Sequence, residues 1–375
     1  MKLAKLSLAA IVAAGAMTTF ASAAPLEETI KGVDLTGLVR YRVDLHDNKQ
    51  NPNTAKGGDT ERHRFSGVFT FTAPVAESVK SVVTLKYDNS DYANNSAASD
   101  KNLAVSQAYF QYAVADYSLK VGKMQLATPW TEDAWDGNFG NGVIGFYNGV
   151  EGWTFAGAAY FNTNATNFPA VTSQKQNIYA AAAIGSVGPV NMQFWASKMT
   201  HVFDSSFFAE LSTGYAGFSL KGQVNHMKLA DELKGGFVDD KGTFWAVEGG
   251  YEYEGANVKA GYVRTDKEMG VYTLSADGQF IMSGQQLYSE TANANNMKTY
   301  FVSAGYALGD FSFGAGYSKA KQASQTYGDE VYVEAGYAYS KNFSLYTYYS
   351  DMDIKDNAAN GDDNKQIRFQ ATYRF

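Results

Sequence analysis

The sequence predicts an all-β fold, a single antiparallel β-barrel of eighteen strands that closes on itself. Three observations lead to this prediction. Apolar and polar residues alternate along most of the chain, long and short connections alternate between these stretches, and no composition shift marks a domain boundary. Tyr (26), Phe (24) and Gly (36) are abundant and Pro (6) is rare, which is typical of a large β architecture.

The first residues have the pattern of an export signal. Lys2 and Lys5 precede an apolar run at 6–17, and residues 21–23 are the small residues at which a signal peptidase cuts. We therefore expect a signal peptide at 1–23 and one barrel domain at 24–375.

Composition excludes several classes of protein. After residue 23 no run of eighteen apolar residues follows, so we expect no membrane-spanning helix. The absence of Cys removes disulfide and thiolate chemistry. The formal charge of −7 becomes −9 without Lys2 and Lys5, and this acidic balance argues against nucleic acid as a partner. An exported chain of this kind is soluble, released or inserted in a membrane as a barrel.

Alternation with a period of two defines the strands. In the final "QIRFQATYRF", Ile367, Phe369, Ala371, Tyr373 and Phe375 share one face, and Gln and Arg residues share the other. Such runs predict strands at 33–45, 61–73, 78–88, 104–115, 117–124, 143–148, 153–162, 176–187, 190–199, 205–215, 218–229, 243–253, 256–266, 297–308, 311–321, 330–340, 342–352 and 366–375.

The connections separate a membrane barrel from a soluble β fold. Longer segments are expected at 46–60, 89–103, 125–142, 163–175, 200–204, 230–242, 267–296, 322–329 and 353–365, and they alternate with tight turns. A soluble sandwich or propeller gives no reason for this alternation. Long loops on one rim and short turns on the other are the arrangement of outer-membrane barrels, and eighteen strands enclose a water-filled lumen.

Arginines gather on the polar face of three strands that only barrel closure makes neighbours. They lie on the first, second and last strands, and they predict a basic patch in the upper lumen: Arg40, Arg42, Arg62, Arg64 and Arg368. The alternative is charge pairing within the wall, because Asp34 and Asp44 share a face with the first pair. We favour a pore-lining role.

Other candidate sites are weaker. The four histidines, His46, His63, His201 and His226, lack the paired spacing of metal or catalytic sites. The sequence "GNGVIG" at 140–145 matches a dinucleotide motif, but a strand follows it where such a motif requires a helix. We interpret it as the return from a loop.

The chain resembles the major outer membrane proteins of Campylobacter and related epsilonproteobacteria, which are general diffusion porins. The resemblance rests on "PLEETIKGVDLTGLVRYR" (25–42), "VGKMQLATPWTEDAWDG" (121–137), "GYVRTDKEMG" (261–270) and the ending "IRFQATYRF". It implies a homotrimer in the Gram-negative outer membrane, an inward-folded third long loop and a preference for cations. Arg40, Arg42, Arg64 and Arg368 match its basic wall, and Asp136 matches an acidic position of the constriction loop.

This resemblance places the third long loop, 125–142, at the constriction. We expect its acidic residues to face the arginines across a narrow passage, and its tryptophans to pack the loop against the wall instead of joining an interfacial aromatic belt. The residues concerned are Glu132, Asp133 and Asp136, and the two loop anchors Trp130 and Trp135. The resemblance also suggests calcium near Asp136; no cofactor is expected to be required.

We therefore expect a porin for ions and small hydrophilic solutes, and no enzymatic step. Expected partners are outer-membrane lipid, lipopolysaccharide and the barrel-assembly machinery, for which Phe375 is the candidate signal. A substrate-specific channel, an outer-membrane enzyme and an adhesin remain the alternatives.

Overall fold

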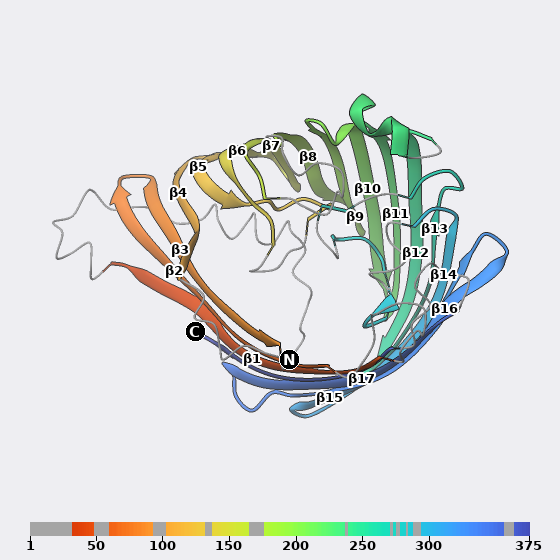
Figure 1. Cartoon of the computed structure of the whole chain (residues 1–375). Helices are drawn as coiled ribbons and strands as arrows, with labels where there is room; N and C mark the ends of the chain where they lie inside the picture. Colours follow the sequence, from red (N-terminus) through yellow and green to blue (C-terminus); the bar gives the residue numbers. More distant parts are fainter. Residues whose placement is uncertain are drawn as a thin grey trace.

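A computed structural model shows eighteen β-strands in one sheet (Figure 1). It describes residues 32–48, 60–92, 103–131, 137–164, 176–236, 239–270, 273–274, 278–282, 284–287, 294–355 and 364–375. The strands are β1 (Asp34–Asn48), β2 (Thr60–Ala76), β3 (Val79–Tyr92), β4 (Ala104–Val114), β5 (Tyr117–Gln125), β6 (Phe139–Val150), β7 (Trp153–Phe161), β8 (Ile178–Val187), β9 (Val190–Met199), β10 (Phe203–Tyr215), β11 (Phe218–Leu229), β12 (Lys241–Tyr253), β13 (Ala256–Thr265), β14 (Met297–Leu308), β15 (Phe311–Gln322), β16 (Gln325–Tyr337), β17 (Phe343–Ile354) and β18 (Asn364–Arg374).

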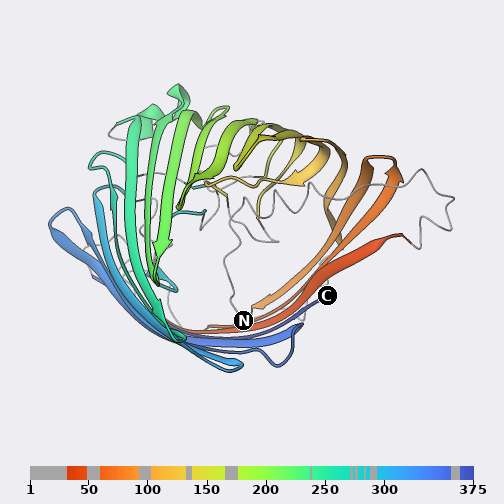
Figure 2. The same cartoon turned by 180° about the vertical axis from the view of Figure 1, so that it is seen from behind.

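The sheet closes into an antiparallel barrel. Each strand pairs with its neighbour in sequence, and β1 pairs with β18 from Leu38 opposite Arg374 to Asn48 opposite Asn364. Figure 2 shows the ring from behind, with the first and last strands together along its lower wall. Closure leaves no strand edge without a partner, as a barrel surrounded by lipid requires. The predicted fold is therefore confirmed.

Tight turns occupy one rim. Seven of the eight connections there have two residues, at 77–78, 115–116, 151–152, 188–189, 216–217, 254–255 and 309–310. Both residues of the turn at 216–217 have positive φ (50° and 86°), as do both at 254–255 (46° and 83°). This pattern is the hairpin turn whose twist matches that of the flanking strands.

The other rim departs from the prediction at three places. A two-residue turn, Ala323 and Ser324, replaces the loop expected at 322–329, because β16 begins at Gln325 and continues the hairpin. The connection expected at 200–204 shortens to 200–202, and the third connection shortens to 126–138 because β6 begins at Phe139. Long and short connections therefore do not alternate strictly.

Alternate residues face the lumen and the outside. On β14, Met297, Thr299 and Phe301 are at most 8% exposed, whereas Tyr300 and Val302 are 48% and 45% exposed. Large apolar side chains are exposed on the outward face of most strands, which is the face that meets lipid in a membrane barrel. No helix in the described residues is long and apolar enough to cross a membrane.

An apolar core lies inside the barrel. Side chains from the inner faces of β5 and β7–β14 pack with described parts of the β5–β6 and β13–β14 connections, and the teal pieces of the latter lie within the ring in both views (Figures 1 and 2). Its largest fully buried members are Trp130, Tyr160, Phe203, Phe208 and Phe244. Described parts of two connections therefore pack inside the barrel against this part of its wall.

Candidate pore constriction

The structure brings the five arginines onto three neighbouring strands. Arg42 on β1 lies opposite Arg64 on β2, and Asp44 lies between Arg62 of β2 and Arg368 of β18 in register. Arg40 is only 8% exposed and lies two residues from Arg42 on the same face. We call these residues the arginine arc: Arg40, Arg42, Arg62, Arg64 and Arg368.

Two members of the arc bind carboxylates in the wall. Arg64 donates Nε and one terminal nitrogen to the two oxygens of Asp88, at 2.8 and 2.7 Å, and Ser66 adds a hydrogen bond of 2.9 Å. Arg368 donates Nε to Asp44, which also accepts Nε2 of Gln366 at 3.3 Å. The first is a bidentate pair, the geometry that fixes a guanidinium most firmly.

A neutral amide holds Arg42. Its Nε and a terminal nitrogen donate to Oε1 of Gln370 at 3.0 and 2.8 Å. Asp44 and Asp88 bring two carboxylates to the five guanidinium groups. The arc is therefore a guanidinium-rich wall in which these two acidic residues offset part of the charge.

An aromatic ring supports one end of the arc. The guanidinium carbon of Arg368 lies 5.1 Å from the ring centroid of Tyr348 on β17, which is 3% exposed. A cation over the face of an aromatic ring is attracted by its quadrupole. Tyr348 therefore supports the guanidinium group that Asp44 also binds.

The first part of the β5–β6 connection contacts a distant wall. The indole of Trp130 is fully buried and donates Nε1 to Oδ1 of Asn225 on β11, at 2.8 Å. Its ring lies 6.4 Å from that of Phe203 on β10. Thr131 donates to the carbonyl of Leu126 at 2.6 Å and so closes a compact turn. Residue 131, where the acidic stretch begins, is thereby held in place.

The acidic candidates of this loop lie outside the described residues. Glu132, Asp133 and Asp136 fall in the segment 132–136, as does the second tryptophan, Trp135. Their approach to the arginine arc therefore stays a prediction.

A second connection, 266–296 between β13 and β14, joins the first inside the barrel. The N–H of Leu274 donates to the carbonyl of Trp130 at 2.6 Å, and that of Gln279 donates to Pro129 at 2.8 Å. Phe280 stacks between Phe208 of β10 and Phe244 of β12, at centroid distances of 5.6 and 4.7 Å. The two connections therefore form one packed unit against β10–β12.

The same connection then reaches β16–β18. The carboxylate of Glu330 on β16, which is fully buried, accepts the N–H groups of Gln285 at 2.8 Å, Gln286 at 3.2 Å and Leu287 at 2.9 Å. The side-chain amide of Gln286 continues to Ser350 of β17 (2.9 Å) and the carbonyl of Asn364 on β18 (3.2 Å). The described residues 279–282 and 284–287 therefore form an internal strap with contacts from β11 to β18.

Sequence reasoning missed the residues that hold these parts in place. Asp88, Asn225 and Glu330 lie at inward positions of β3, β11 and β16. The alternation of their strands could have marked all three as inward polar groups. The partners of Asn225 and Glu330 come from loops, which have no periodic pattern, so no signal in the sequence could have paired them.

The histidines serve as ordinary polar residues. His63 contacts Tyr41 and Glu61, and His226 contacts Thr243. His201 contacts Glu232 at 3.0 Å, and hydrogen bonds from the Glu232 backbone N–H and then from His201 hold the pKa of that carboxyl below its usual value. The described residues contain no group of three or more His, Asp or Glu side chains that could hold a metal ion. Asp136 lies outside them, so no step is assigned to calcium.

Comparison with known proteins decides the family. The sequence model of the family "Campylobacter major outer membrane protein" matches residues 1–375, the whole chain. The chain belongs to this family. Its closed barrel and its family together make it a passive diffusion porin of the Gram-negative outer membrane.

Solved structures agree on the fold. The barrel is similar to Pseudomonas aeruginosa OccK11 (OpdR), with a TM-score of 0.73, 13% identity and coverage of 96% of this chain and 99% of that one. Acinetobacter baumannii OccAB3 matches with a TM-score of 0.74 and 12% identity, over 92% of this chain and 99% of that one. A BenF-like porin from Pseudomonas fluorescens Pf-5 matches with a TM-score of 0.71 and 16% identity, over 91% of this chain and 99% of that one. At such identity the likeness concerns the fold alone. Among curated proteins no match was found.

Proposed function

We propose that ions and small hydrophilic solutes cross this porin through a charged constriction, with no covalent step. One wall of the constriction is the arginine arc, and the opposite wall is the third loop with Glu132, Asp133 and Asp136. The observation that carries this proposal is the cluster of five arginines on the inner faces of β18, β1 and β2, in a barrel whose apolar core packs on other strands.

The two walls would create a transverse field. Unit charges ~8 Å apart interact by about 0.5 kcal/mol in bulk water and by about 2 kcal/mol at an effective permittivity near 20. Such a field orients polar solutes and penalises apolar ones, which cannot replace the ordered water they displace. Small hydrophilic molecules are therefore the substrate class, and the excess of acidic residues in the chain adds a mild cation preference.

The third loop is held inward in this proposal. Trp130, through its contacts with Asn225 and Phe203, would anchor the loop before its acidic residues, and Trp135 would anchor it between Asp133 and Asp136. The strap supports the loop from behind, because Gln279 hydrogen-bonds Pro129 and Phe280 packs against the same wall. The carboxylates therefore keep a fixed distance from the arc.

The proposal also covers the oligomer and its membrane surroundings. We infer a homotrimer surrounded by outer-membrane lipid and lipopolysaccharide, delivered by the barrel-assembly machinery. Phe375, the proposed assembly signal, exchanges two backbone hydrogen bonds with Gly37 (2.9 and 3.1 Å), and its ring lies 5.9 Å from that of Phe69. Its recognition must therefore precede closure of the barrel.

Planar-bilayer recording tests the proposal. Wild-type protein should form stable open channels, and liposomes containing it should swell with small sugars and not with large ones. Arg40→Ala and Asp136→Asn should each change conductance or ion selectivity. If neither variant alters the channels, these residues do not form the constriction. If wild-type protein forms no channels, the porin function itself is contradicted.

Two further experiments separate the alternatives. Conductance that saturates with a single solute would identify a substrate-specific channel, whereas an adhesin or enzyme would conduct little in bilayers. For calcium, a chelator should change the conductance of wild type and leave Asp136→Asn unchanged if the ion binds at that carboxylate.

A further inference from the structure

A row of cations lies on the outer wall, at the long-loop ends of β13, β14 and β15. In register, Arg264 lies directly opposite Lys298, and Lys298 lies directly opposite Lys321. We call these three residues the basic row. Figure 1 shows β13 and β14 side by side in the right-hand wall of the barrel.

The basic row points away from the lumen. On β13 the flanking residues Val263 and Thr265 are buried inward, as Met297 and Thr299 are on β14. The next residues on the face of the row include Tyr300, which is 48% exposed. Because successive side chains of a strand point to opposite faces, the three cations lie on the lipid-facing side.

Like charges directly opposite each other destabilise a sheet. Within the described part of the chain, no ion pair joins a carboxylate to Arg264, Lys298 or Lys321. The row therefore places three positive charges on adjacent strands without a counter-charge from its own wall. An anion from outside would remove this repulsion.

The positive surface extends beyond the row. Lys228 and Lys241 lie directly opposite each other on β11 and β12, and Lys198 lies on β9. Among these, Asp204 is the shared partner of Lys198 (3.7 Å) and Lys228 (3.4 Å). Cations thus lie at the long-loop rim on β9 and on β11–β15, with Asp204 of β10 between them.

Aromatic rings lie beside the row. Tyr262 and Tyr300 are two residues nearer the short-turn rim than Arg264 and Lys298, and their centroids are 4.9 Å apart. Trp245 on β12 adds a third ring, 5.1 Å from Tyr262. Aromatic side chains of this kind mark the membrane–water interface of barrels. The row therefore lies at the level of the lipid headgroups, on the long-loop side.

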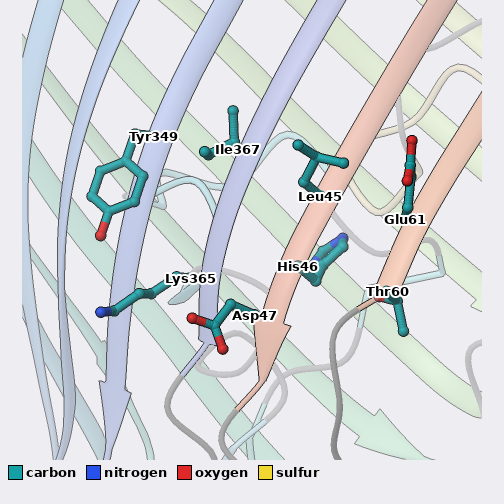
Figure 3. Close-up of a pocket in the computed structure, with 8 residues that line it drawn as sticks. All are labelled: Leu45, His46, Asp47, Thr60, Glu61, Tyr349, Lys365 and Ile367. Carbon is teal, nitrogen blue, oxygen red and sulfur yellow. The ribbon is translucent and has the colours of Figure 1, made fainter.

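The next strands on this rim, β16 and β17, carry acidic residues. Asp329 lies opposite Asp353 on β16 and β17, and Lys365 lies 3.9 Å from Asp351. Figure 3 shows Lys365 beside Asp47 in the hollow on the outer wall between β17 and β2, and the two residues are opposite each other in register. Cations here are matched by acids, which distinguishes these strands from the basic row.

We propose that the basic row binds the phosphate groups of a phosphorylated lipid in the outer leaflet. Guanidinium and ammonium groups donate charge-assisted hydrogen bonds to phosphate, and the acyl chains would lie against the aromatic and aliphatic wall below. This inference locates the lipid contact of the proposed function and depends on the barrel's place in the outer membrane. A second copy of the chain fits less well, because the positive arc spans β9 to β15 and a subunit contact would cover only part of it.

Lipid binding to the purified full-length protein tests the proposal. The probe is bisphosphorylated lipid A, compared with dephosphorylated lipid A, and the readout is the amount retained in native mass spectrometry. The variant is Arg264→Gln/Lys298→Gln/Lys321→Gln. Near an anionic surface each cation contributes about fivefold, so retention of the phosphorylated lipid should fall by about a hundredfold.

A matched control removes three other lysines. Lys341→Gln/Lys355→Gln/Lys365→Gln has the same charge loss and should retain lipid A as wild type does. The charge-keeping variant Arg264→Lys/Lys298→Arg/Lys321→Arg should also retain it, even if the glutamine variant folds poorly. Ion conductance in bilayers should stay unchanged throughout, so a failure of this inference is distinguishable from a failure of the porin proposal.

Three outcomes would overturn the inference. The first is unchanged retention in the glutamine variant. The second is an equal loss of phosphorylated and dephosphorylated lipid A, which would mean that the apolar wall alone binds. The third is dissociation of an oligomer with lipid retention preserved, which would make the row a subunit contact.

Discussion

The carboxylate of Glu330 accepts the backbone N–H of Leu287 at 2.9 Å, and this contact fixes one end of a strap that crosses the lumen to β11. At the other end, the N–H of Ile281 donates to Gln223 at 2.6 Å. A channel stays open only if its internal loops keep one position. The buried carboxylate of Glu330 holds this loop in place.

Removing that carboxylate should release the strap. Glu330→Ala leaves the N–H groups of three successive residues without their acceptor, and each hydrogen bond to a charged group contributes about 1.5–3 kcal/mol. We expect a lower unfolding temperature and a current with frequent partial closures in single-channel recording. Glu252→Ala, which changes an exposed carboxylate of β12, should leave both unchanged. Steady current in the Glu330 variant would mean that the strap does not depend on this residue.

The anchor of the third loop predicts a graded series. Trp130→Phe keeps the buried ring and loses the hydrogen bond to Asn225, so it should cost about 1 kcal/mol. Trp130→Ala also leaves a cavity and should cost about 3–5 kcal/mol. Denaturant unfolding of the purified protein measures both. If the two variants lose equal stability, the packing of Trp130 is not what holds this segment.

The pair formed by Arg64 and Asp88 should set ion selectivity through its two charges. Asp88→Asn makes the arc more positive and should lower the ratio of cation to anion permeability, whereas Arg64→Gln should raise it. A unit charge ~8 Å from the path is worth about 0.5 kcal/mol in water and acts on cations and anions with opposite sign, so each ratio should change by up to about fivefold. The double variant should return close to wild type. Reversal potentials in a salt gradient measure the ratio, and Asp116→Asn in a short turn is the control.

Glycine at the return of the third loop is required for strand pairing. A Cβ added to Gly142 on β6 would lie 2.0 Å from the carbonyl oxygen of Ala159 on β7, whereas one added to Gly157 would meet nothing within 4 Å. Gly142→Ala should therefore lower the temperature at which the barrel unfolds on a heated gel, and Gly157→Ala should not. Equal behaviour of the two variants would contradict the close approach of β6 and β7.

The sequence predicts the barrel well because alternation is local. The prediction for β9, residues 190–199, agrees with the structure at both ends, and the arginine arc follows from closure alone. The predicted strand at 330–340 begins five residues later than β16, because the stretch 325–329 is largely polar and resembles a loop. The pairing of Gln322 with Gln325 makes this stretch part of a hairpin.

The lumen could be predicted only in part, since its contacts join segments far apart in the chain. The predicted alternative of charge pairing in the wall applies to Asp44, which binds Arg368, but Asp88 was not recognised as the partner of Arg64. The strap was unpredictable for the same reason: the binding of Glu330 to residues 285–287 depends on the path of a loop that carries no periodic pattern.

The reversal potential of Arg42→Gln and Asp136→Asn tests the charged constriction most directly. Arg42 is bonded to the neutral Gln370, so its removal leaves no unpaired carboxylate in the wall. In the same salt gradient, Arg42→Gln should shift the potential towards stronger cation preference, and Asp136→Asn should shift it in the opposite direction. Shifts of the same sign, or no shift in either variant, would contradict a passage bounded by these two walls.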